Sequence, residues 1–290
     1  MATPLIRSLC VVGVGLIGGS WARALRDAGQ VEEVVGCGRD QGNLKRAVEL
    51  GVIDRWSIDV AEAVRGCDLI VVAVPLGAME SVLRAMAPAL KPGAVVTDVG
   101  SAKASVVEAA GRAFSGVPPF FVPGHPTAGR EHSGVEAADG TLYRDRRVIL
   151  TPLRNTDPMA LERVERAWRA AGAEVSRMEV EHHDEVLAAT SHLPHVLAFA
   201  LVDSLANTRY GDEIFSYAAG GFRDFTRIAS SDPVMWRDIC INNREAILAM
   251  VERFERDLAG LRDTIDAGDG QAILELFQRA KHARDTHVIK

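Results

Sequence analysis

Four stretches of this 290-residue sequence gather side chains that commonly catalyse reactions, at residues 98–103, 123–134, 190–195 and 220–236. The second stretch places His125 between glycine and proline residues, which restrict the backbone as a site needing one imidazole orientation would require. Histidine titrates near neutral pH and therefore suits a general base. The alternative is a loop histidine that only hydrogen-bonds a carbonyl group.

The stretch at 190–195 lies inside a predicted helix that Pro194 interrupts. Because proline cannot donate a backbone hydrogen bond, the helix should bend there and free a carbonyl group near Thr190. His192 and His195 are three residues apart and so lie on neighbouring faces. We predict no metal site, since no third ligand follows at a suitable spacing.

Two arginines, Arg223 and Arg227, lie four residues apart in the last stretch. Guanidinium groups pair bidentately with carboxylates, so this spacing favours a clamp for a carboxylate on the substrate. The alternative is that one of the two arginines forms a structural ion pair with Asp224 or Asp232.

A glycine motif near the N-terminus predicts a dinucleotide site. An apolar run enters the turn formed by Gly13, Gly15 and Gly18, and a helical pattern follows at once. These glycines permit a tight turn, the approach of a pyrophosphate to the backbone, and close packing of helix on strand. Leu16 and Ile17 begin the helix, whose free N–H groups would hold the phosphates. An ordinary glycine-rich turn is the alternative.

The residues after the second predicted strand bear on the choice of dinucleotide. Chains that prefer NAD usually carry an acid about twenty residues beyond the last glycine. Here Gly38 and Arg39 occupy that region, and Asp40 follows them. A small residue and an arginine leave room and charge for a 2′-phosphate, which favours NADP over NAD. Use of both stays open, because Asp40 could still reach a ribose hydroxyl.

Alternating strand and helix patterns through the first 180 residues predict an α/β fold with a Rossmann-like, doubly wound parallel sheet. Continuous apolar runs at 69–74 and 94–99 indicate strands buried on both faces. The other predicted strands are 9–12, 33–36, 120–122, 147–150 and 174–178. Ligands of such sheets bind beyond the carboxyl ends of the strands. Val74, Pro75 and Ser101 therefore join the predicted cofactor site.

Strand patterns stop after residue 180, whereas helical patterns continue. We therefore predict a dinucleotide-binding domain at 1–180 and an all-helical substrate and dimerisation domain at 181–290. Apolar residues within 242–267 step by four and three, which is a heptad seam on a long helix. The seam suits a homodimer, and packing within a helical domain is the commoner alternative.

Composition restricts the class of protein. A net charge of −6 argues against nucleic-acid binding, and no run approaches the ~20 apolar residues of a membrane span. The four scattered cysteines include no C-x-x-C pair, which fits a reducing cytoplasm and provides no zinc or disulfide framework. We expect a cytoplasmic protein whose ligand is a small molecule, with no nucleic acid and no membrane as partner.

Five ordered segments resemble the prephenate/arogenate (cyclohexadienyl) dehydrogenase family of tyrosine biosynthesis. They are GVGLIGGS at 13–20, VTDVGSAKA at 96–104, GHPTAGREHSGV at 124–135, TSHLPHVLAFAL at 190–201 and GGFRDFTRIASSDPVMWRDI at 220–239. The resemblance covers nearly the whole chain and implies a nucleotide-binding domain followed by a helical dimerisation domain. It also implies oxidative decarboxylation of prephenate, arogenate or both, with hydride transfer to NAD(P)⁺.

The resemblance further implies roles for individual residues. His125 matches the catalytic histidine, and Ser101 matches the serine beside it at the ring hydroxyl. Arg227 matches the arginine that binds the substrate carboxylate, and His195 matches a histidine that binds the side chain of prephenate. The other implied substrate contacts are Glu131, Trp236, Thr190 and Ser191. Thr127 departs from the family, which often has Ile or Met there.

Prephenate and arogenate stay open as substrates because they differ only by a keto or an amino group, although His195 favours prephenate or both. A hydroxyacid or imino-acid oxidoreductase is the alternative enzyme. That class usually has a catalytic lysine on a helix of its second domain, whereas Lys281 and Lys290 are the only lysines after Lys103. A non-catalytic dinucleotide sensor is the third hypothesis, but a sensor would not need His125 framed by glycine and proline.

Overall fold

The structure, a computed structural model, describes residues 4–129 and 133–287. The contacts between Cα atoms divide the chain into two compact units, Met1–Arg244 and Glu245–Lys290. This division follows compactness, whereas the expected boundary between residues 180 and 181 follows a change in secondary structure. That boundary stays a prediction.

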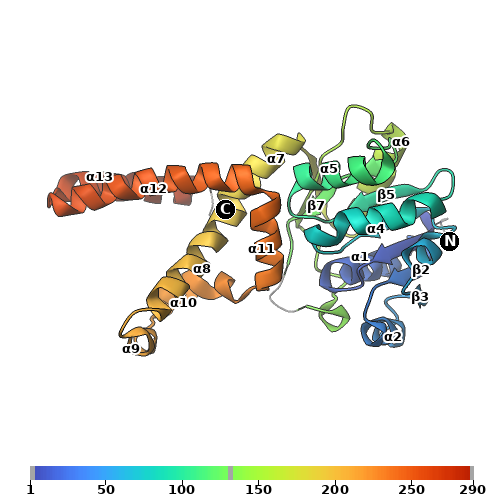
Figure 1. Ribbon diagram of the computed structural model, residues 1–290, viewed down its shortest axis with the longest axis horizontal. Helices are drawn as coiled ribbons and strands as arrows, with labels where there is room; N and C mark the ends of the chain where they lie inside the picture. The colour runs from blue at the N-terminus through green and yellow to red at the C-terminus, as the bar shows by residue number, and fades with distance from the viewer. Residues whose placement is uncertain (1–3, 130–132, 288–290) are drawn as a thin grey trace. The chain divides into compact units, whose positions relative to one another are not determined.

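Six parallel strands form the central sheet of the first unit, in the order β3-β2-β1-β4-β5-β6 (Figure 1). The strands are β1 (Ile6–Val12), β2 (Val31–Cys37), β3 (Arg55–Ser57), β4 (Leu69–Val72), β5 (Val95–Asp98) and β6 (Phe121–Val122). The chain order reverses between β1 and β4, so their carboxyl ends flank the switch point where such sheets bind ligands. The predicted doubly wound sheet is confirmed, and β3 is an additional short edge strand.

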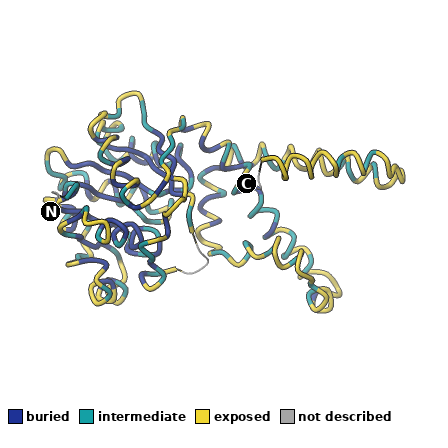
Figure 2. The backbone as a smooth tube through the Cα atoms, turned by 180° about the vertical axis from the view of Figure 1, so that it is seen from behind, coloured by how far each residue is buried: buried dark blue, intermediate teal, exposed yellow. Residues whose placement is uncertain are grey.

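Helices cover both faces of this sheet and bury its apolar strands (Figure 2). One face packs against α1 (Leu16–Asp27), α2 (Gln41–Glu49) and α6 (Pro158–Ala170). The other packs against α3 (Val60–Val64), α4 (Met79–Met86) and α5 (Lys103–Phe114). Trp21 of α1 stacks on Trp168 of α6 with ring centroids 4.3 Å apart. This two-sided burial explains why β4 and β5 read as unbroken apolar runs.

A second sheet has three strands, β7 (Gly124–Pro126), β8 (Arg147–Leu150) and β9 (Glu174–Arg177). Strand β7 runs antiparallel to β8 and places His125 opposite Ile149. The sequence predicted a loop at this position. Glycine and proline are rare inside strands, so β7 gives no strand pattern and forms only because β8 lies beside it.

The helical part begins with α7 (Val180–Leu187), the π-helical turn η4 (Ala188–His192) and α8 (Leu193–Ala206). Pro194 lies in the first turn of α8 and has no N–H group, and the Leu193 N–H bonds the carbonyl of Ala188, five residues earlier. The predicted interruption at Pro194 therefore takes the form of a π-turn.

The continuous segment Val180–Ala206 is long and apolar enough to cross a membrane by length and composition alone. The sequence expectation concerned an unbroken apolar run, and this segment includes charged residues such as Glu181, Asp184 and Glu185, so the expected absence of a membrane partner stays a prediction. Length and composition do not establish a span, because core helices of water-soluble proteins meet the same criteria.

The first unit continues through α9 (Gly211–Ser216), α10 (Gly220–Thr226), the 3-10 turn η5 (Arg227–Ser230) and α11 (Pro233–Asn242). The helices α12 (Arg244–Asp266) and α13 (Gly270–His287) account for the second unit. Helix α12 matches the long helix predicted within 242–267. Three residues of the heptad seam on α12 are exposed, Phe254, Leu258 and Ile265.

Candidate active site

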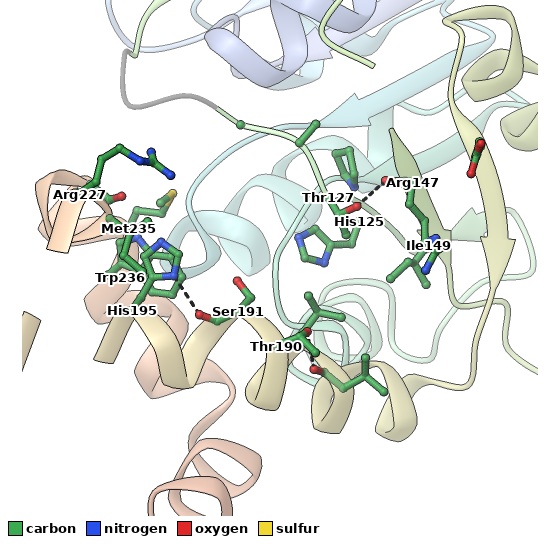
Figure 3. A pocket seen from close by; sticks show the side chains of 18 of the residues that line it. His125, Thr127, Arg147, Ile149, Thr190, Ser191, His195, Arg227, Met235 and Trp236 are labelled. Atoms are coloured by element: carbon green, nitrogen blue, oxygen red, sulfur yellow. Dashed lines mark hydrogen bonds between the residues drawn. The ribbon is translucent and has the colours of Figure 1, made fainter. Parts of the chain in front are cut away.

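A cavity of about 790 Å³ lies in the first unit, between the strands β7 and β8 and the helical segments η4, α8, η5 and α11. Figure 3 shows His125 and Thr127 on the strand side and His195, Trp236 and Arg227 on the helical side. The cavity brings together six residues of the predicted site, His125, Thr190, Ser191, His195, Arg227 and Trp236. The stretch around His125 and the stretch that begins at Thr190, more than 60 positions apart in the sequence, thus line the same cavity.

The structure does not place the other two residues of the predicted site in this wall in the same way, because only one of them is described. Ser101 is half-buried in the loop between β5 and α5 and is not among the residues that line the cavity within the described chain. Glu131 lies outside the described residues. The wall also contains Asp145, Arg147 and Glu174, which belong to no motif and which the sequence therefore did not identify.

His125 is buried, with 8% of its surface exposed. Its Nδ1 lies 2.9 Å from Nε2 of His183, whose Nδ1 lies 2.7 Å from Oδ1 of Asp184. Burial lowers the pKa of His125 well below its ordinary value, and the neighbouring His183 and Lys103 lower it further. A neutral imidazole with Nδ1 engaged leaves Nε2 for a ligand, which is the arrangement that a general base needs.

His183 and Asp184 were missed by the sequence analysis. In α7 the buried residues Val180, His183, Asp184 and Leu187 repeat at the spacing of one helix face. Polar side chains at two of these core positions are the signal that could have identified them, because a buried polar group needs a partner.

A buried ion pair supports the strand that carries His125. Nζ of Lys103, which is fully buried, donates to Oδ2 of Asp98 at 2.5 Å and to the carbonyl of Gly124 at 2.6 Å. Oδ1 of Asp98 accepts the N–H of Gly124 at 3.0 Å. Burial lowers the pKa of Lys103, although the charge of Asp98 opposes this shift. The pair connects β5 and α5 to β7.

The helical wall depends on the π-turn. His195 donates from Nδ1 to the carbonyl of Ser191 at 2.9 Å, and its ring stacks on Trp236 with centroids 3.6 Å apart. Burial lowers the pKa of His195, the bond to Ser191 opposes this, and Arg227 adds to the lowering. With Nδ1 engaged, Nε2 of His195 remains for a ligand.

His192 and His195 do not face a common ligand. His195 lines the cavity, whereas His192 is buried and its Nδ1 accepts the side-chain N–H of Asn243 at 3.0 Å. Within the part of the chain that the structure describes, no three His, Cys, Asp or Glu side chains are arranged to hold a metal ion.

Only one of the two predicted arginines lines the cavity. Arg227 is at the start of η5, whereas Arg223 lies on α10 and is not a wall residue. The clamp of two arginines is therefore not formed by the described wall. Asp232 caps α11, because its Oδ1 accepts the N–H groups of Val234 and Met235 at 2.8 and 2.9 Å.

The turn after β1 fits a dinucleotide. Gly13 has a φ of +99°, and a Cβ on it would collide with the carbonyl of Ala73. A Cβ on Gly18 would collide with the carbonyl of Gly13, whereas the corresponding position on Gly15 faces open space. Helix α1 starts after Gly15 without a side-chain cap. Its first N–H groups are thus available to a pyrophosphate.

The residues after β2 differ in their contacts. Oδ1 of Asp40 accepts the N–H groups of Gly42 and Asn43 at 2.8 and 3.2 Å and so caps α2. Arg39 is exposed and makes no hydrogen bond or ion pair with another described residue. Gly38 lies between the end of β2 and these two residues, Arg39 and Asp40.

Comparisons with known proteins agree over nearly the whole chain. Residues 21–177 match the family model of the prephenate dehydrogenase nucleotide-binding domain, and residues 179–279 match that of its dimerization domain. Cyclohexadienyl dehydrogenase of Zymomonas mobilis is 38% identical over 97% of this chain and 96% of its own length.

Two solved structures have the same fold. Prephenate dehydrogenase of A. aeolicus, in complex with hydroxyphenyl propionate and NAD⁺, aligns with a TM-score of 0.90 and 36% identity over 98% of both chains. Arogenate dehydrogenase of Synechocystis aligns with a TM-score of 0.81 and 30% identity over 97% of this chain and all of that one.

Proposed function

Because this chain belongs to the prephenate dehydrogenase family, we propose that its cavity binds prephenate, arogenate or both and that His125 accepts the proton of the ring 4-hydroxyl group. The protein is a dehydrogenase that converts these cyclohexadienols to 4-hydroxyphenylpyruvate or tyrosine by oxidative decarboxylation, with a nicotinamide dinucleotide. The observation that carries the role of His125 is a buried, neutral imidazole with Nδ1 engaged and Nε2 left for the cavity.

The proton of the 4-hydroxyl group passes to Nε2 of His125 as the C4–O bond becomes a carbonyl and the hydride leaves C4. A bound nicotinamide supplies the hydride acceptor. The ring carboxylate then departs as CO₂, and the electrons of its C–C bond complete the aromatic ring. The phenolate oxygen takes the proton back from His125, so the base is regenerated.

We assign the remaining contacts from their positions in the wall. Arg227 carries the charge that a substrate carboxylate needs. Neutral His195 presents an unprotonated Nε2, which accepts a hydrogen bond from the ammonium of arogenate, whereas protonated His195 donates to the keto acid of prephenate. Ser101 is assigned to the ring hydroxyl by the family match alone, and its place in the loop after β5 is compatible with that role.

We further propose that NADP is preferred to NAD. The support is that Asp40 is engaged in capping α2, whereas the guanidinium of Arg39 is available for a 2′-phosphate. The residues proposed to hold the dinucleotide are Gly13, Gly15, Leu16, Ile17, Gly18, Gly38, Arg39, Asp40, Val74, Pro75 and Ser101.

We also propose that the protein is a homodimer in the cytoplasm. The match to a dimerization domain and the exposed apolar residues Phe254, Leu258 and Ile265 support the dimer. Light scattering of the purified protein should give the mass of two chains, and the mass of one chain would contradict the proposal. The four free cysteines suit a reducing compartment, which cell fractionation would test.

The reaction is tested with purified protein, prephenate or arogenate, and NAD⁺ or NADP⁺, in all four combinations. Formation of the reduced nicotinamide, followed by its near-ultraviolet absorbance, should occur in at least one combination. The fastest combination would identify both the substrate and the dinucleotide. If a protein that binds dinucleotide gives no product in any combination, the proposed function is wrong.

A further inference from the structure

Three buried side chains form a hydrogen-bonded series behind the cavity. Nδ1 of His125 lies 2.9 Å from Nε2 of His183, and Nδ1 of His183 lies 2.7 Å from Oδ1 of Asp184. His183 is fully buried, and Asp184 is 5% exposed. The reaction proposed above uses only His125, so the other two side chains need a separate explanation.

Asp184 is held in place by the backbone of another helix. Its Oδ1 accepts the N–H of Lys103 at 2.7 Å, and its Oδ2 accepts the N–H of Ala104 at 2.9 Å. These groups begin α5, whose own N-cap residue, Ala102, provides no side-chain cap. Asp184 therefore caps α5 from α7, and both of its oxygens act as acceptors.

The carboxylate of Asp184 determines which atom donates and which accepts in each hydrogen bond between the three side chains. An ionised carboxylate only accepts hydrogen bonds, so Nδ1 of His183 must carry a proton and donate it to Asp184. A neutral His183 then has a lone pair on Nε2. His125 must donate its Nδ1–H to that lone pair, which leaves the lone pair of Nε2 on His125 for the cavity.

The charge states required by this scheme agree with the surroundings of the three groups. Burial would raise the pKa of Asp184, but the bonds from His183 and from the two backbone N–H groups outweigh it and lower the pKa. Burial lowers the pKa of His183 in spite of the bond to Asp184, and the charge of Lys103 adds to this lowering. Asp184 is thus ionised and both imidazoles are neutral at neutral pH.

We propose that Asp184 and His183 are positioning residues that fix the tautomer of His125, so that its unprotonated Nε2 meets the substrate hydroxyl. The inference rests on the proposed role of His125 as base. In the opposite tautomer, Nε2 would carry a proton and could not accept another. A wrong tautomer in a comparable histidine–carboxylate pair costs up to about 10⁴-fold in kcat.

The first test needs neither substrate nor a destabilising variant. ¹⁵N NMR of the histidine rings distinguishes protonated from unprotonated nitrogens, and comparison with His125→Asn assigns the signals of His125. We expect Nδ1 of His125 to be protonated and Nε2 to be unprotonated at neutral pH. A protonated Nε2, in either the neutral or the cationic ring, would overturn the proposal.

The second test compares two amides at position 183. His183→Asn keeps a donor near Asp184 but is too short to reach His125, whereas His183→Gln places a carbonyl oxygen where it can accept the Nδ1–H of His125. We expect His183→Asn to lower kcat by on the order of 10²–10⁴-fold, with KM and dinucleotide binding little changed. His183→Gln should restore a large part of kcat and of the wild-type tautomer.

The outcomes separate this proposal from the proposed function. If His183→Asn keeps the wild-type kcat, or if folded His183→Gln is as impaired as His183→Asn, the positioning role is wrong. If the wild-type protein turns over neither substrate with either dinucleotide, the proposed function fails. The NMR result for His125 then still decides whether the series sets its tautomer.

Discussion

At the scale of single residues, the site depends on ionisable groups whose hydrogen bonds leave one chosen atom for the ligand. His125 and His195 each have Nδ1 engaged by the protein, so each offers Nε2 to the cavity. The sequence identified both residues because they lie in motifs framed by glycine or proline. It could not identify His183, since the tautomer of His125 depends on a contact 58 positions away in the chain.

His125→Asn should lower kcat by about 10²–10⁴-fold, because an amide cannot accept the hydroxyl proton as a base. Dinucleotide binding should persist, since the glycine turn lies on another strand. Steady-state kinetics and a dinucleotide titration measure the two effects. Arg223→Ala is the control, because this exposed residue is not part of the cavity wall and its loss should leave kcat near that of wild type. Near-normal turnover by His125→Asn would contradict the assignment.

At the scale of elements, the site is assembled by contacts that no single element encodes. Strands β1, β4 and β5 were predicted because their apolar runs are buried on both faces, whatever their partners. Strand β7 has the sequence Gly-His-Pro and no such run, so it exists through its pairing with β8 and its tie to Lys103. Local patterns therefore predicted the sheet, but they did not predict the short strand that carries the base.

Lys103→Met tests whether the contacts of Lys103 with Asp98 and with the carbonyl of Gly124 stabilise the fold around β7. Removing one partner leaves Asp98 as an uncompensated buried charge, so the free energy of unfolding should fall by roughly 3–5 kcal/mol. Denaturant unfolding measures the change. Arg84→Met is the matched control, because it breaks the exposed Arg84–Glu80 pair and should change the free energy of unfolding far less. Equal effects of the two substitutions would show that the Lys103–Asp98 pair does not support β7.

At the scale of the whole molecule, four histidines among the described residues have lowered pKa values, and burial is the largest cause for each. They are His125, His183, His192 and His195, and the pKa of His192 falls to about 4. In the unfolded chain these groups take up protons near their ordinary pKa of 6.5. Below that pH the unfolded state binds more protons than the folded state, so stability falls as pH falls.

The melting temperature should therefore decrease as the pH is lowered from about 7.5 to about 5. Thermal unfolding at several pH values measures this trend. His192→Asn should reduce the loss, since its side-chain oxygen can still accept from Asn243 but does not titrate. A melting temperature that is constant over this range, or a loss that His192→Asn leaves unchanged, would contradict the explanation.

The fold class, the order of motifs and the helical second half were predictable from the sequence, because periodicity and glycine chemistry are local. The compact units divide after residue 244, and no local pattern marks this division, because it depends on contacts between distant segments. The same limit applies to Asp145, which lies in the turn before β8, and to Glu174 at the start of β9, because both enter the cavity wall only through the fold.

The stacking of His195 on Trp236 gives the protein a built-in optical reporter. The protein has four tryptophans, and Trp21 and Trp168 stack on each other in the core. Among the described residues that line the cavity, Trp236 is the one tryptophan, and it stacks on His195. Indole emission responds to its immediate surroundings, so a ligand entering beside the stacked pair should change the fluorescence of Trp236. Occupancy of the pocket could then be titrated in a variant that does no chemistry, such as His125→Asn, with Trp236→Phe as the silent reference.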